Sequence, residues 1–161
     1  MDLTSLLLLV GLTFLPTAEG RYAILYAFVN GYPLWTAFIV ASAGVVMLAF
    51  FLAWFIGFVD VVIEFIVKHG GKGLGGFVER VYRWYRNRAM QRSRRVRGEL
   101  LLLILFVAAP FPGTGMWTGS LVGHLSGMNR KNLFLALLIG GLTSNVLVYI
   151  MVQAGIRVWG T

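Results

Sequence analysis

Four apolar stretches dominate the 161-residue sequence, and they constrain its fold more than any other feature. Residues 34–67 and 133–158 are each long enough to cross a bilayer as a helix, because about 20 residues suffice. Hydrophobic residues make up 58% of the chain and charged residues 12%, a balance that soluble domains do not show. One soluble core could not bury this much apolar surface. The sequence therefore predicts an all-α integral membrane protein.

The other two apolar stretches, residues 3–32 and 99–127, are interrupted by proline and glycine at residues 16–21 and 110–115. The apolar arm before each interruption has ten residues, and at about 1.5 Å per residue it reaches half-way through a core of about 30 Å. Each stretch is therefore either one kinked spanning helix or a re-entrant hairpin of two half-helices. Such dense proline and glycine breaks a helix rather than bending it, so we expect hairpins.

An internal repeat relates the two halves of the chain. The leucine run at 6–9 aligns with that at 100–103, and at the same offset Pro16 aligns with Pro110. Each half is then a hairpin followed by one crossing helix, which makes the two repeats inverted, the plan of many secondary transporters. The expected organisation is one membrane domain over 1–161, built from repeat 1 (1–67, crossing helix 34–67), a linker (68–98) and repeat 2 (99–161, crossing helix 132–158).

Positive charge is concentrated in the linker. Of the 14 Lys and Arg residues, nine lie between Lys72 and Arg97. By the positive-inside rule this block is cytoplasmic and both termini lie outside, in a multi-pass protein of a cell membrane, here a prokaryotic plasma membrane. Nucleic-acid binding is the rival interpretation, but the block lies between two membrane segments, so we expect lipids as partners and no nucleic acid. We expect an interfacial basic helix whose lipid contacts are Arg80, Arg83, Trp84 and Arg86.

Glu19 and Arg21 are the first candidates for chemistry, because they lie at the tip of the first hairpin. A charge inside a bilayer costs about 2.5–3.5 kcal/mol even on a lenient scale, so such groups are paired, hydrated or functional. The functional interpretation is a proton or ion relay at Glu19 and an anion-binding cation at Arg21. The alternative is a structural ion pair, or a loop that surfaces at the interface.

The second tip, with Pro112, Gly113, Thr114 and Gly115, offers backbone groups instead of charges. A half-helix that starts near Met116 points free N–H groups toward the tip, and these can bind an anion. Thr114 adds a hydroxyl for a ligand or as a helix cap, and the two roles are not exclusive.

Other polar residues have weaker claims. Asp60 and Glu64 lie one helical turn apart and, with Glu99, form either a proton path or a set of interfacial carboxylates. Ser120 and His124 also lie one turn apart, which admits a serine hydrolase, but no orienting acid accompanies them. No nucleotide or zinc motif is present. We expect no enzyme activity, no cofactor and no metal. Mid-span polar residues of the last helix are expected to form a close packing face, at Thr143, Ser144 and Asn145.

Two segments resemble the motifs of a known family, the small multidrug export proteins. Residues 19–24 (EGRYAI) resemble its Glu-x-Arg-Gly-Ala-Ile stretch, and residues 109–119 (APFPGTGMWTG) resemble its Pro-x-Pro-Gly-Thr-Gly-x-Trp-Thr-Gly signature. The chain departs from the first motif at Tyr22, where the family tends to have glycine, and at Leu25, where it tends to have proline. The resemblance covers nearly the whole chain.

That family is similar in plan to the DedA (SNARE-associated/VTT) superfamily, whose members carry two facing re-entrant hairpins and include lipid flippases and scramblases. The resemblance implies that the site residues are Glu19, Arg21 and the loop 112–115. We therefore expect a proton-linked transporter or flippase for an amphipathic, anionic substrate such as a lipid phosphate or a drug-like molecule, acting as a homo-oligomer, with a dimer favoured. The alternatives are a passive scramblase or channel, and a membrane assembly protein that transports nothing.

Overall fold

The computed structural model describes residues 3–15, 19–69, 76, 80, 96–111 and 113–159. In this part of the chain the structure is helical and contains no strand. The helices are α1 (Leu3–Phe14), α2 (Glu19–Val29), α3 (Leu34–Phe55), α4 (Phe58–His69), α6 (Val96–Ala108), α7 (Met116–Leu125) and α8 (Arg130–Trp159).

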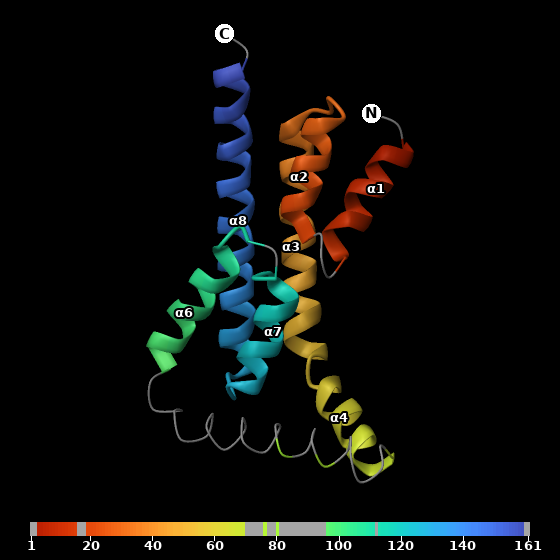
Figure 1. The fold of residues 1–161 in the computed structure, drawn as a ribbon, viewed down its shortest axis with the longest axis vertical. Helices are drawn as coiled ribbons and strands as arrows, with labels where there is room; N and C mark the ends of the chain where they lie inside the picture. The colour runs from red at the N-terminus through yellow and green to blue at the C-terminus, as the bar shows by residue number, and fades with distance from the viewer. Residues whose placement is uncertain are drawn as a thin grey trace.

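Two long helices, α3 and α8, form the centre of the molecule and run in opposite directions (Figure 1). The helices α1 and α2 form a hairpin whose bend lies near mid-height, and α6 and α7 form a second hairpin whose bend meets it from the other end. The start of α1 and the end of α8 lie at the same end of the molecule. The arrangement thus brings the two interrupted segments together between the two long helices.

Small residues allow the helices to approach closely. Ala37 and Ala41 of α3 are fully buried. A Cβ on Gly140 of α8 would lie 2.9 Å from the Ile104 carbonyl oxygen of α6, and a Cβ on Gly141 would lie 2.8 Å from a Val45 methyl of α3. Such small-residue contacts replace the hydrophobic driving force that is missing between helices in lipid. Of the residues predicted for the packing face of the last helix, Ser144 and Asn145 are buried and Thr143 is exposed.

The outer surface of the long helices is apolar. Large exposed side chains on it include Met47 and Phe55 of α3 and Ile150 and Met151 of α8. Soluble monomers rarely expose apolar surface on this scale, which indicates contact with lipid. Within the described ranges, two helices are long and apolar enough to cross a membrane, over Leu34–Phe55 and Arg130–Gly155. These features support the prediction of a membrane protein.

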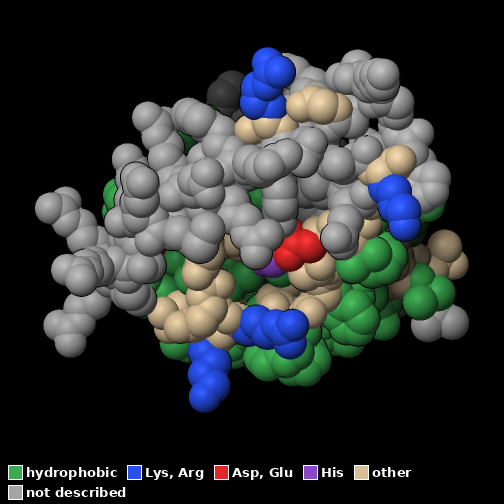
Figure 2. Space-filling model, turned by 90° about the horizontal axis from the view of Figure 1, so that it is seen from below, with side chains coloured by type: hydrophobic (Ala, Val, Ile, Leu, Met, Phe, Trp, Pro, Cys, Tyr) green, Lys and Arg blue, Asp and Glu red, His purple; other side chains and the backbone are tan. Residues whose placement is uncertain are grey.

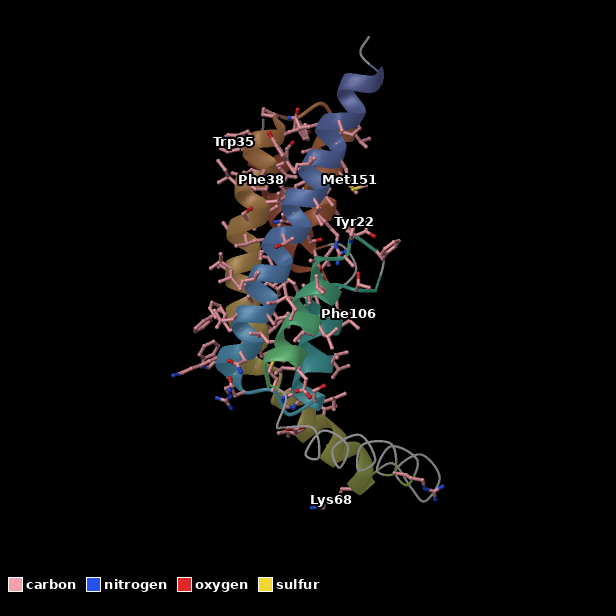
Figure 3. All side chains as sticks on the ribbon, turned by 90° about the vertical axis from the view of Figure 1, so that its left-hand side faces the viewer. Tyr22, Trp35, Phe38, Lys68, Phe106 and Met151 are labelled. Carbon is pink, nitrogen blue, oxygen red and sulfur yellow. The ribbon has the colours of Figure 1, made fainter. Side chains whose placement is uncertain are left out.

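A group of aromatic residues lies at the end of the molecule opposite Lys68 (Figure 3). The rings of Trp35 and Phe38 stack at 5.8 Å, and Tyr149 of α8 lies 5.1 Å from Phe38. Lys68 lies at the other end of the molecule. Aromatic residues favour membrane interfaces, because their rings are apolar on one side and polar on the other.

The predicted crossing helix at 34–67 is wrong in one respect, because the structure divides it. Helix α3 ends at Phe55, a turn at Ile56–Gly57 follows, and α4 continues as a separate helix. Glycine weakens a helix interior, and α4 is amphipathic, with Asp60 and Lys68 among apolar residues. The segment beyond residue 57 therefore lies at the end of the molecule and does not extend α3 (Figure 1).

The hairpins and the opposed directions of α3 and α8 fit the predicted plan of two related halves. That the hairpins re-enter a bilayer and that the halves are inverted repeats stay predictions. Most of the basic linker, including Arg83, Trp84 and Arg86, lies outside the described residues. Gly76 and Arg80 are described, and both are helical and exposed.

Candidate functional site

Glu19 begins α2 at the tip of the first hairpin. Its side chain is buried, with 6% of the residue exposed, and its φ of 55° places it in the left-handed region. This conformation costs a non-glycine residue on the order of 1 kcal/mol. The Glu19 carboxylate is thus held inward at the cost of local backbone strain. Strained backbone conformations cluster at functional sites in proteins.

Arg21 connects the two hairpins. Its Nη2 donates to Glu19 Oε2 at 3.0 Å, an ion pair in which both side chains are buried. Its Nη1 donates to the carbonyl oxygens of Ala109 and Phe111, at 3.0 and 3.2 Å, in the second tip. These carbonyls follow the C-terminal end of α6, where the helix dipole favours a cation. Arg21 therefore joins the two tips.

The carboxylate of Glu19 occupies the N-terminal end of α7. The backbone N–H of Trp117, one of the free amides of that helix, donates to Glu19 Oε1 at 3.4 Å. Gly115 has no room for a side chain, because a Cβ there would collide with the Glu19 carboxyl group. In this structure the group at the second tip is the chain's own carboxylate. Binding of a substrate anion there stays a prediction.

Thr114 acts within the loop and not as a helix cap. Its hydroxyl lies 2.7 Å from the Ala109 carbonyl oxygen and 2.8 Å from that of Phe111, so it donates to these two acceptors. Gly115 holds the N-cap position of α7, without a side-chain hydrogen bond. The alternative of Thr114 as the cap is therefore wrong, and its hydroxyl shares the acceptors that Arg21 uses. Gly113 has a φ of 87°, which glycine adopts without strain. Pro112 lies outside the described residues.

Several buried polar groups near the tips have no hydrogen-bond partner. A Cβ on Gly20 would lie 2.9 Å from both amide atoms of Asn145 on α8, so these residues are in close contact. The Nδ2 of Asn145, the Oγ atoms of Ser42 and Ser144, and the Nε1 of Trp117 are buried and unpartnered. Buried polar groups are normally satisfied, so unpaired ones mark places for water or a ligand.

Asp60 and His124 form a second polar group at the other end of α7. His124 Nε2 lies 3.1 Å from Asp60 Oδ2, which joins α4 to the second hairpin. Figure 2 looks onto this end and shows an acidic side chain beside a histidine, with Lys and Arg side chains around them. Ser120 is buried and donates to the Trp117 carbonyl at 2.7 Å, so it is not paired with His124.

The remaining predicted carboxylates do not join the tips. Glu99 lies in the first turn of α6, half-buried and remote from the bend of its hairpin. Glu64 lies on α4, and its side chain is outside the described ones. A proton path through Asp60, Glu64 and Glu99 stays a prediction.

Sequence reasoning missed two contributors to the site. The carbonyls of Ala109 and Phe111 are backbone groups, which side-chain motifs do not reveal. The amide of Trp117 is one of the free N–H groups expected where α7 begins.

The charges at the tips are closely balanced. One carboxylate faces one guanidinium, the α7 N-terminus carries a partial positive charge, and the end of α6 carries a partial negative one. Such a site binds a further anion only if its own carboxylate leaves or is neutralised, because an unpaired buried charge is costly.

Comparison with known proteins identifies the family. The family model described as "Putative small multi-drug export protein" matches residues 19–147, from Glu19 at the first tip to the middle of α8. No curated protein and no solved structure gave a match. The match spans most of the chain, so the chain belongs to the family of small multi-drug export proteins.

Proposed function

We propose that this protein transports a small amphipathic acid across the membrane, and that its Glu19 carboxylate exchanges places with the acid group of the substrate. The observation that carries the proposal is the position of that carboxylate, on Arg21 and on the α7 N-terminus. Arginine and free helix amides are the groups that bind phosphates and carboxylates. The site therefore has the chemistry of an anion site that holds an internal ligand.

Proton linkage follows from the charge balance. A substrate anion adds one negative charge to a site where Glu19 and Arg21 already cancel. If Glu19 takes up a proton as the substrate arrives, the buried charge stays near zero and Arg21 can turn to the substrate. If it stays ionised, the two anions repel each other at a few ångströms. Substrate and proton are then carried together.

The proposed setting is a multi-pass membrane protein with two re-entrant hairpins and a cytoplasmic basic linker, assembled as a homodimer. The exposed apolar surface of α3 and α8 supports the membrane part of this proposal. The two tips lie at mid-height (Figure 1), where transporters with broken helices hold their substrates. Alternate opening of the two hairpins would expose the site to one side at a time.

The test is uptake of a radiolabelled monoalkyl phosphate into liposomes that contain the purified protein, with and without an imposed pH gradient. We expect wild-type uptake to follow the gradient. Glu19→Gln keeps the shape but cannot exchange a proton, so its uptake should no longer respond to the gradient. Arg21→Ala should lose uptake, because its guanidinium is the cation that contacts both tips. Glu79→Gln, in the linker and outside every candidate site, is the control for loss of a carboxylate elsewhere.

Three outcomes decide between the functions. Gradient-driven uptake that is unchanged in both tip variants refutes the mechanism. Wild-type flux that ignores the pH gradient identifies a passive scramblase or channel. Absence of flux of any probe, with tip variants that assemble normally, identifies a structural or assembly protein.

A further inference from the structure

An apolar pocket of about 690 Å³ opens on the side of the molecule next to the tips. Its wall comes mainly from α3, with Phe14 from α1, Trp117 from α7 and Phe134 from α8. Trp117 is the residue whose backbone amide faces Glu19. The pocket therefore begins at the candidate site. The remaining lining residues all belong to α3 and are Val46, Met47, Leu48, Phe50, Phe51 and Phe55.

A second pocket, of about 440 Å³, lies toward the basic end of the molecule and has a mixed lining. Asp60, His124 and Arg130 contribute its charged and titratable side chains, from α4, α7 and α8 respectively. The apolar part of the wall includes Trp54 and Met128. In this pocket Arg130 lies beside an apolar floor, and the Asp60 carboxylate is held by His124; a cation on an apolar lining is what an acidic headgroup on an apolar chain requires.

The two pockets adjoin each other. Phe55 lines both of them. The Trp54 ring in the wall of the second pocket meets the Phe134 ring in the wall of the first edge to face, with centroids 6.0 Å apart. Together they extend along α3 from Trp117 near mid-height to Asp60 and Arg130 at the basic end. A molecule that occupied both would have its polar end at the basic end of the protein and its apolar end beside the tips.

We infer that these two pockets form one loading site for a single-chain amphiphile with an acidic headgroup, taken from the membrane leaflet at the basic end. The headgroup lies at Arg130 and His124, and the chain lies in the apolar pocket and ends at Trp117. The orientation is that of a lipid in this leaflet, with its head at the surface and its tail toward the bilayer centre. The inference rests on the proposed function for the charge of the substrate.

The volume of the apolar pocket sets the number of chains. A methylene takes on the order of 30 Å³, similar to a water molecule in the liquid. The pocket of about 690 Å³ therefore holds roughly 20 such groups, which is one alkyl chain of ordinary length. A two-chain phospholipid would leave one chain outside. Trp117 lines the inner end of the pocket, and its Nε1 is buried without a hydrogen-bond partner.

The experiment measures the Kd of a radiolabelled single-chain alkyl phosphate for the purified protein in detergent. Met47→Trp fills the apolar pocket, and its matched control is Met151→Trp, since both methionines are 63% exposed and only Met47 lines the pocket. Arg130→Gln removes the cation, and its control is Lys131→Gln, an exposed neighbour outside the lining. We expect each pocket variant to raise Kd about tenfold, with both controls near wild type.

Other outcomes overturn the inference. An unchanged Kd in Met47→Trp, or an equal loss in Met151→Trp, means that the chain does not lie in this pocket. Equal affinity for a two-chain phosphatidic acid means that the pocket takes bulk lipid and does not select one chain. Loss of a dimer in Met47→Trp without a change in Kd identifies the pocket as an interface between copies. Failure of the proposed function would give a different result. Transport would then not depend on Glu19, whether or not Met47→Trp changes the Kd.

Discussion

The contact between Gly115 and Glu19 predicts a specific stability effect. Gly115 has φ −88° and ψ −170°, which alanine adopts freely, so Gly115→Ala does not strain the backbone and acts mainly through its Cβ. That Cβ collides with the Glu19 carboxyl group and forces it off the α7 N-terminus and off Arg21. Breaking a buried ion pair costs at most about 3–5 kcal/mol, and the helix-terminus interaction adds about 0.3–1 kcal/mol. Allowing for relaxation, we expect a loss of about 3 kcal/mol in unfolding free energy.

The double-mutant cycle with Glu19→Ala isolates this contact. Alanine is also a poorer N-cap than glycine, by about 1 kcal/mol, and this part of the loss does not depend on residue 19. In the Glu19→Ala background, Gly115→Ala should therefore cost about 1 kcal/mol, leaving a coupling of about 2 kcal/mol. The assay is reversible unfolding in mixed detergent micelles. Gly11→Ala is the control, because nothing lies within 4 Å of its Cβ. Equal losses in both backgrounds would refute the placement of the carboxylate.

Three further predictions concern packing at and near the tips. Gly20→Ala should lower the unfolding free energy by about 1–3 kcal/mol, because its Cβ would lie 2.9 Å from the Asn145 amide; a wild-type melting temperature would contradict this contact. Gly44→Ala should cost a similar amount, since its Cβ would lie 2.5 Å from Thr13 Oγ1, and Thr13→Ala should restore only part of the loss in the same melt, because the Thr13 Cβ at 2.7 Å remains. Thr114→Val removes the hydroxyl bonds to the second-tip carbonyls and should cost about 1 kcal/mol, whereas Thr114→Ser should stay within about 0.5 kcal/mol of wild type.

The fold was predictable where proline and glycine interrupt the apolar segments. Proline and glycine at 16–21 and 110–115 indicated both bends, and α7 begins at Met116 as predicted. The end of α3 at Phe55 was not predictable in this way, because Ile56–Gly57 carries no proline and the apolar pattern continues past it. The turn there depends on α4 lying at the end of the molecule, where Asp60 reaches His124 of another helix. Such a tertiary contact leaves no local signal.

The site was predictable in its residues and less so in its geometry. Glu19 and Arg21 stood out because charges in an apolar segment need a reason, and the free amides of α7 followed from its expected start. The sequence did not show that the Glu19 carboxylate accepts a hydrogen bond from a free amide of α7. That result depends on the left-handed backbone at Glu19 and on the missing side chain at Gly115. Neither is visible in a pattern of residue types.

The ion pair between Glu19 and Arg21 also bears on how the chain is made. The two residues are two positions apart, whereas their contacts with Ala109 and Trp117 span 88 and 98 residues. At about 5–20 residues per second, the ribosome takes on the order of ten seconds to reach α7 after it has made Glu19. During that interval the first hairpin has only its own pair to neutralise its two charges. The Glu19–Arg21 ion pair therefore neutralises the first hairpin in the membrane before the second hairpin is made. The second hairpin then packs against two charges that already cancel.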